Sequence, residues 1–204
     1  MGDPLPFTPP SPRAEVLVRH RAIGRDKFLR QRGLAPGAVA FADVSSRSPD
    51  PVLRALSPFH PCPGGVPVPG DGEGRRAGSV EGAWQGLKVF SGAAAGGADE
   101  RMAFDLAARP RKRKAPSGES VVGHRLGGEL LAYVEARKRL YVPMYEWTLR
   151  HCPDAARALR ALRELRARRQ VLVLLDFDTN ADVEDATRPL SHASLVARAL
   201  DWDA

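Results

Sequence analysis

The chain has 204 residues, 43% of them hydrophobic, and a formal net charge of +7. This length allows one domain with a full core and at most a small appendage. No apolar run is long enough to cross a bilayer. The first residues, MGDPLPFTPPSPR, have neither the apolar centre of a secretory signal nor a myristoylation pattern. We therefore expect a cytoplasmic protein that does not bind membranes.

The N-terminal quarter predicts an arm, two strands and a long loop. Residues 1–13 are Pro-rich and are expected to be a disordered arm, so that a single domain spans 14–204. Residues 14–20 and 37–46 have the composition of strands, and we expect them to pair as the start of a small antiparallel sheet. Residues 57–78 are crowded with Pro and Gly, which predicts a loop.

The rest of the chain is mostly helical in pattern. Apolar residues recur at helical spacing, Pro143 is expected to kink or split the longest helix near residue 142, and Ser79 is a plausible N-cap. The predicted helices cover residues 79–90, about 101–109, 127–151, 153–169 and from 191 onward, and the best strand candidate covers 171–178. This order predicts an α+β fold, a mostly helical single domain with a small, mainly antiparallel sheet.

A polar stripe in SVEGAWQGLKVF is the first candidate for a site. Glu81, Gln85 and Lys88 are spaced to share one face of a helix, beside an apolar stripe that includes Trp84. A carboxylate, an amide and an ammonium in this arrangement suit a binding site in which a water is activated. The same residue types are also typical of the solvated side of a helix, and a Trp at this phase is more often part of the core.

Two motifs together resemble those of the NADAR (YbiA-like) family. The segment LSPFHPCP is similar to that family's loop motif through Leu56, Ser57, Phe59 and Pro61. The following segment is similar to its helix motif S-x-E-H-x-x-Q-x-x-K-F, with the spacing from Ser79 to Lys88 intact.

Further resemblances lie downstream, so that similarity covers roughly residues 50–200. RLYVPMYEWTLR is similar to another helix of that family, with Arg139 near the expected place. The chain also carries signatures that resemble an uncharacterised bacterial and phage family: Gly123–Gly127, Tyr133–Arg137 and Pro189–Ala193.

The resemblance implies an N-glycosidase that hydrolyses a ribose–nitrogen bond, with no cofactor and no metal. Its substrate is expected to be a ribosyl nucleotide compound or an ADP-ribosylated nucleic acid. Glu81 is expected to be catalytic. The family's closing motif is absent, so Asp182, Glu184 or Asp185 is expected to supply the second carboxylate; the spacing does not select among them, and we assign Asp185. The expected substrate-binding residues are Ser57, Phe59, Trp84, Gln85, Lys88, His124, Arg125, Arg139 and His192.

The acidic and the basic segments each allow two interpretations. The acidic residues from Asp176 to Asp185 are compatible with a divalent cation site or with a solvated loop. The basic run at 109–114 is compatible with a solvated loop or with a nucleic-acid contact. Cys62 and Cys152 lie in no motif that would make them metal ligands or nucleophiles. A non-catalytic nucleotide-binding or nucleic-acid-binding protein with the same fold is therefore the alternative function.

Overall fold

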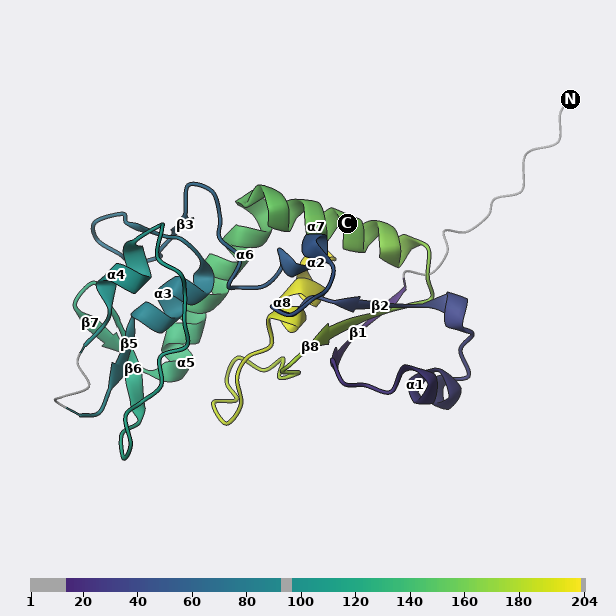
Figure 1. The fold of residues 1–204 in the computed structure, drawn as a ribbon, viewed down its shortest axis with the longest axis horizontal. Coiled ribbons are helices and arrows are strands. Elements are labelled where there is room, and N and C mark those ends of the chain that lie inside the picture. The colour runs from purple at the N-terminus through teal and green to yellow at the C-terminus, as the bar shows by residue number, and fades with distance from the viewer. Residues whose placement is uncertain (1–13, 93–96, 203–204) are drawn as a thin grey trace, which may run out of the picture.

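A parallel three-stranded sheet forms one end of the molecule (Figure 1). The computed structural model describes residues 14–92 and 97–202, so the predicted arm at 1–13 lies outside the described residues. The strands of this sheet, in spatial order, are β1 (Glu15–His20), β8 (Val171–Asp176) and β2 (Val39–Asp43).

The expected antiparallel pairing of the first two strands is wrong. Strand β8 lies between β1 and β2 and pairs with both of them in parallel. Every residue of β8 is buried. Parallel sheets are usually covered on both faces and therefore have continuously apolar strands, as in the run VLVLL of β8. Residues from the far end of the chain thus separate the two strands that are close in sequence.

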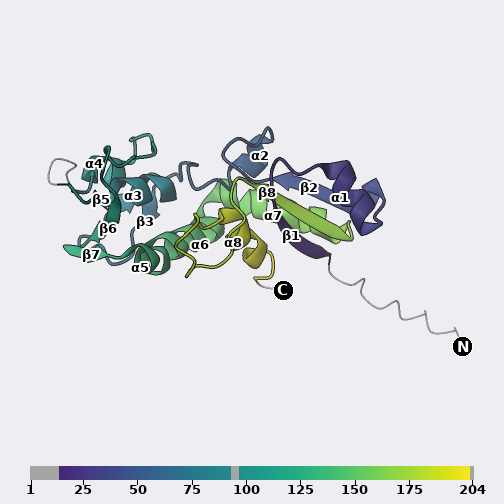
Figure 2. The ribbon, with the colours of Figure 1, turned by 90° about the horizontal axis from the view of Figure 1, so that it is seen from below.

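Helices cover both faces of this sheet (Figure 2). Side chains alternate between the faces of a strand. In β8, Val173 packs with Phe28 of α1 (Arg25–Arg32) in one apolar cluster. Leu172 and Leu174 belong to the main core on the other face, which α7 (Pro153–Ala167) and α8 (His192–Ala199) complete. The predicted helices at 153–169 and from 191 onward are confirmed.

The long helical block contains an irregularity close to the predicted place. Helix α5 (Tyr133–Ala136) continues into a π-helical segment (Arg137–Tyr141) and then into α6 (Val142–His151). Pro143 lies in the first turn of α6, where its missing N–H is tolerated best, and the helix changes type just before it. Residues 129–131 were predicted to be helical, but they form a strand.

The other end of the molecule holds two antiparallel sheets and two short helices. Its elements are β3 (Val66–Pro67), β4 (Arg76–Ala77), α3 (Val80–Gly86), β5 (Lys88–Phe90), α4 (Glu100–Phe104), β6 (Val121–Leu126) and β7 (Glu129–Leu131). Helix α2 (Pro51–Arg54) lies near the parallel sheet instead. The sheets are β3-β4 and β5-β6-β7. The predicted loop at 57–78 therefore contains two short strands.

Helix α3 is shorter than predicted. Its N-cap is Ser79, as expected, because the side chain of Ser79 accepts a hydrogen bond from the backbone N–H of Gly82. The helix ends at Gly86, and Lys88 begins strand β5, which pairs with β6. A Cβ atom on Gly86 would lie 2.5 Å from the backbone nitrogen of Ala103, so only glycine permits this close packing of α3 against α4.

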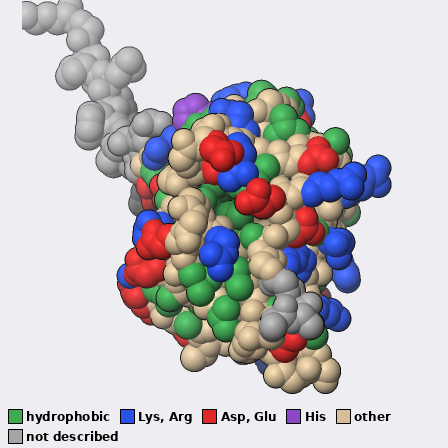
Figure 3. Space-filling model, turned by 90° about the vertical axis from the view of Figure 1, so that its left-hand side faces the viewer, with side chains coloured by type: hydrophobic (Ala, Val, Ile, Leu, Met, Phe, Trp, Pro, Cys, Tyr) green, Lys and Arg blue, Asp and Glu red, His purple; other side chains and the backbone are tan. Residues whose placement is uncertain are grey.

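Together these elements form one compact α+β domain, which confirms the predicted mixed fold class. Helices α6 and α8 lie between the parallel sheet and the end that contains α3, whereas α5 lies beside β6 at that end. Seen from that end, Lys and Arg side chains gather along one side of the surface (Figure 3). Among the described residues, no helix is long and apolar enough to cross a membrane.

Candidate functional site

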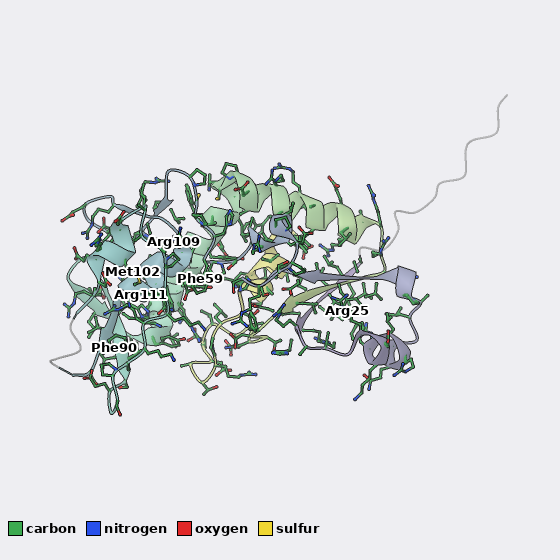
Figure 4. All side chains as sticks on the ribbon, viewed as in Figure 1. Arg25, Phe59, Phe90, Met102, Arg109 and Arg111 are labelled. Atoms are coloured by element: carbon green, nitrogen blue, oxygen red, sulfur yellow. The ribbon has the colours of Figure 1, made fainter. Side chains whose placement is uncertain are left out.

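A cavity of about 520 Å³ lies where α3 meets the carboxyl ends of β8 and β2. Ligands of α/β proteins commonly bind outside the carboxyl ends of parallel strands. Phe59, from the loop before α3, lies in the middle of the molecule between α3 and the parallel sheet (Figure 4). The lining residues are Ser46, Arg47, Ser57, Pro58, Phe59, Glu81, Trp84, Gln85, Lys88, Lys112, Tyr133, Arg137, Tyr141, Asp176, Phe177, Asp178, Pro189, Leu190 and His192.

Glu81, Gln85 and Lys88 form a hydrogen-bonded row on the α3 wall. Gln85 donates from Nε2 to Oε1 of Glu81 at 2.6 Å, and Lys88 donates from Nζ to Oε1 of Gln85 at 2.7 Å. The backbone N–H of Arg113 donates to the same oxygen at 2.9 Å. These two donors fix the orientation of the amide, because its oxygen must face them and its NH₂ must then face Glu81.

Arg113 also holds the end of α3. Its guanidinium donates to the backbone carbonyls of Gln85, Gly86 and Lys88 at 3.0, 2.9 and 2.8 Å. The basic run at 109–114 is thus anchored against α3 at this residue. Its neighbour Lys112 lines the cavity, whereas Arg109 and Arg111 do not.

Burial shifts the pKa values of both charged groups in this row toward their neutral forms. Burial raises the pKa of Glu81, although the hydrogen bond from Gln85 and the charge of Lys88 act in the opposite direction. Burial likewise lowers the pKa of Lys88, opposed by the charge of Glu81. Raised carboxyl pKa values in a cavity are typical of groups that transfer protons near neutral pH.

The opposite wall is held by Asp176 at the end of β8. Its Oδ2 accepts a hydrogen bond from Ser191 Oγ at 2.8 Å and lies 3.1 Å from Nδ1 of His192, while its Oδ1 accepts from the N–H of Phe177. Nε2 of His192 lies 2.9 Å from the carbonyl oxygen of Val44, which can only accept, so Nε2 carries a hydrogen. Asp176 and His192 therefore serve mainly to position this wall.

Asp178 is the second carboxyl group that is available to a ligand. It lines the cavity and is half-buried. Burial and the nearby charge of Asp176 raise its pKa. Glu81 and Asp178 are thus two carboxyl groups with raised pKa values on the wall of one cavity, from α3 and from the segment after β8 respectively.

Seven of the predicted site residues come together in this cavity. They are Ser57, Phe59, Glu81, Trp84, Gln85, Lys88 and His192. Trp84 combines the two predicted roles, because it is buried in the core and also lines the cavity. Both ring nitrogens of His192 contact protein atoms, so its ring presents carbon atoms to the cavity.

Asp185 does not line the cavity, so the structure does not place it as the second carboxylate. Its side chain accepts hydrogen bonds from Thr187 and Arg188, which lower its pKa. Asp185 turns toward its own loop because Arg137 holds the backbone of that loop. The guanidinium of Arg137 donates to the carbonyls of Val183, Asp185 and Arg188.

Three other predicted residues also lie outside the cavity lining. His124 is fully buried behind Trp84, with ring centroids 3.7 Å apart, and both of its ring nitrogens lack a hydrogen-bond partner among the described residues. Burial lowers the pKa of His124 to about 3, so it is neutral at physiological pH. Arg125 is exposed on β6, and Arg139 forms an exposed ion pair with Glu129.

Several residues that line the cavity are not among the predicted site residues. Arg137 belongs to the signature Tyr133–Arg137 and lines the cavity, but the predicted binding residue in this region is Arg139. Arg137 is 1% exposed, and its hydrogen bonds in the described part of the chain go to carbonyl and hydroxyl oxygens. Asp176 and Asp178 are predicted to belong to a cation site or to a solvated loop, not to the wall of a cavity. Their position at the end of a buried strand was the signal that could have identified them as part of a cavity.

A family model matches residues 26–196, and its description is "Family of unknown function (DUF6939)". The chain belongs to this family. The match includes every residue that lines the cavity. No curated protein and no solved structure matches the chain. Membership of DUF6939 does not test the resemblance to the NADAR family, which therefore stays a prediction.

The acidic segment does not form a recognisable metal site. No cluster of three or more His, Cys, Asp or Glu that could hold a metal ion occurs within 14–92 and 97–202. Asp182 and Asp185 each accept hydrogen bonds from backbone N–H groups of their own loop. The solvated-loop interpretation therefore fits residues 182–185, whereas Asp176 is buried.

Proposed function

We propose that this DUF6939 protein is a cytoplasmic N-glycosidase that hydrolyses the ribose–nitrogen bond of an ADP-ribosylated base or a related ribosyl nucleotide compound. The observation that carries the proposal is the buried carboxyl group of Glu81, held by Gln85 on a cavity wall with a raised pKa. Only one oxygen of Glu81 accepts a hydrogen bond from the described residues, which leaves the other for a ligand or water.

Hydrolysis of this bond requires a base, an acid and stabilisation of positive charge. The ribose–nitrogen bond breaks with its electron pair going to the base nitrogen, which takes a proton, and the sugar passes through an oxocarbenium-like state. Water then adds to the anomeric carbon and loses a proton. We assign the stabilisation of positive charge and the deprotonation of water to Glu81, and the protonation of the leaving nitrogen to Asp178.

The remaining lining residues suit an anionic ribosyl ligand. Arg47, Lys88, Lys112 and Arg137 all line the cavity, so phosphate groups of a nucleotide would meet cationic side chains. The buried guanidinium of Arg137 is stabilised by carbonyl oxygens rather than by a carboxylate, so its positive charge adds to the field in the cavity. Trp84 offers an aromatic surface to the leaving base.

The proposal is tested with an oligonucleotide that contains ADP-ribosylated guanine. Wild-type protein should release ADP-ribose, Glu81→Gln should release none, and Asp178→Asn should be slower by a factor of about 100 to 10,000, the usual contribution of an acid–base group. Asp185→Asn is the matched control, because Asp185 lies outside the cavity, and it should act like the wild type. Undiminished release by Glu81→Gln would contradict the assignment.

The alternative is a non-catalytic protein that binds nucleotides or nucleic acid with the same cavity. The exposed basic residues Arg109, Arg111 and Lys114 beside Lys112 favour it. Phosphate neutralisation by such residues makes binding strongly dependent on salt. If the alternative holds, the protein binds unmodified DNA with a steep salt dependence, Arg111→Ala and Lys114→Ala flatten this dependence, and no ADP-ribose is released.

A further inference from the structure

Phe177 is an exposed aromatic residue at the mouth of the cavity. It follows directly after β8, whose six residues are all buried, yet 40% of its own surface is exposed. It also lines the cavity. An apolar ring in this position contributes little to the core, because the residues that pack between the sheet and its helices precede it in the strand.

Two guanidinium groups lie close to this ring. The Cζ atoms of Arg21 and Arg47 are 4.8 and 5.6 Å from the ring centroid of Phe177. Arg21 is held by the carboxylate of Asp43, to which it donates at 2.9 Å. The guanidinium of Arg47 makes no hydrogen bond or ion pair with the described residues, is exposed and lines the cavity, so it remains available for an anion.

All three strands of the parallel sheet contribute to this group. Arg21 follows β1, Arg47 follows β2 and Phe177 follows β8, so their side chains meet where the carboxyl ends of the strands lie together. Glu81 and Trp84 line the same cavity from α3. A ligand that fills the cavity would therefore contact the α3 wall at one end and Phe177 at the other.

We propose that Phe177 and Arg47 form a second subsite, which binds a planar aromatic ring next to an anionic group. The ring stacks on Phe177 and the anion, a phosphate group, pairs with Arg47. This inference rests on the proposed function, which places the reacting bond at Glu81. The subsite then implies that the part of the substrate beyond the reacting sugar is a nucleotide. Phe177 is then a specificity-determining residue that contacts the ligand and takes no part in the bond cleavage.

The test compares the binding of AMP and ribose phosphate, which differ by the aromatic ring. Base–aromatic stacking is worth about 1–3 kcal/mol, so wild-type protein should bind AMP about 5 to 150 times more tightly than ribose phosphate. Phe177→Ala should remove this difference, and Phe177→Tyr should keep it. Arg47→Ala should weaken the binding of both ligands. Leu130→Ala, which removes an exposed apolar side chain outside the cavity, is the control and should change neither affinity.

The subsite would be refuted by equal affinities of the wild type for AMP and ribose phosphate. It would also be refuted if Phe177→Ala kept the preference for AMP, or if this substitution lowered the affinity for both ligands by the same factor. Binding is measured at equilibrium without cleavage, so the outcome is separate from that of the hydrolase assay. A preference for AMP that depends on Phe177, in a protein that releases no ADP-ribose, would support the subsite and reject the N-glycosidase.

Discussion

Replacing Arg137 by methionine should destabilise the protein strongly, because this buried arginine donates four hydrogen bonds. Its guanidinium donates to the carbonyls of Val183, Asp185 and Arg188 and to the hydroxyl of Tyr133. A hydrogen bond contributes about 0.5–1.5 kcal/mol net, so the loss of these four predicts a decrease of about 2–6 kcal/mol in the free energy of unfolding. Methionine retains most of the apolar stem, which limits the effect to the polar interactions.

Urea unfolding measures this change, with Arg139→Met as the matched control. Arg139 lies two residues away, is exposed, and pairs with exposed Glu129, so its replacement should leave the unfolding midpoint unchanged. Hydrogen exchange of the backbone amides at 183–190 should also become faster in Arg137→Met alone. Equal midpoints for the two variants, or unchanged exchange in this loop, would refute the role of Arg137 as the residue that holds the loop.

The remaining predictions concern titrating groups. Burial raises the folded-state pKa of Glu81 above 4.5, so ionisation of Glu81 costs stability as the pH rises through the folded value; Glu81→Gln should therefore raise Tm at pH 7, but not below about pH 4, in thermal scans. His124 has a pKa of about 3 in the folded protein and 6.5 as its ordinary value, so the folded state binds fewer protons between these values and loses stability as the pH falls. The free energy of unfolding should decrease by about 2 kcal/mol from pH 7 to pH 5, and this decrease should disappear in His124→Phe. The same dependence of the free energy of unfolding on pH in both proteins, measured by urea unfolding, would contradict this. If Asp178 is the acid, Asp178→Asn should also abolish the alkaline fall in the rate of hydrolysis, which an unchanged pH profile would exclude.

Local signals in the sequence predicted most of the helices and the best strand. Ser79 predicted the start of α3, and the apolar run VLVLL predicted β8. Both predictions succeed because helix capping and burial on both faces of a sheet select particular residue types. The order of the strands was not predictable in this way. The pairing of β1 with β8 joins opposite ends of the chain, and no local pattern encodes it.

The α3 wall of the cavity was predicted, whereas the opposite wall was not. Glu81, Gln85 and Lys88 lie together as their spacing suggested, although Lys88 reaches the row from a strand. Asp178 and Phe177 follow the central strand of the parallel sheet, which places them at the cavity. Because the sheet was predicted to be antiparallel, these two residues were not predicted to lie there. The sequence does not distinguish Asp185 from Asp182 and Glu184, and the contacts of its loop with Arg137 can be seen only in three dimensions.

The most direct test of the central claim is a single-turnover hydrolysis of the ADP-ribosylated guanine oligonucleotide in water labelled with heavy oxygen. Mass spectrometry of the released ADP-ribose then shows whether water has added to the anomeric carbon, with free ADP-ribose in the same solvent as the control for exchange. We expect heavy oxygen at that carbon in the wild type, incorporated faster than by exchange, and no product from Glu81→Gln. Labelled product from Glu81→Gln at the wild-type rate, or no product from either protein, would contradict it.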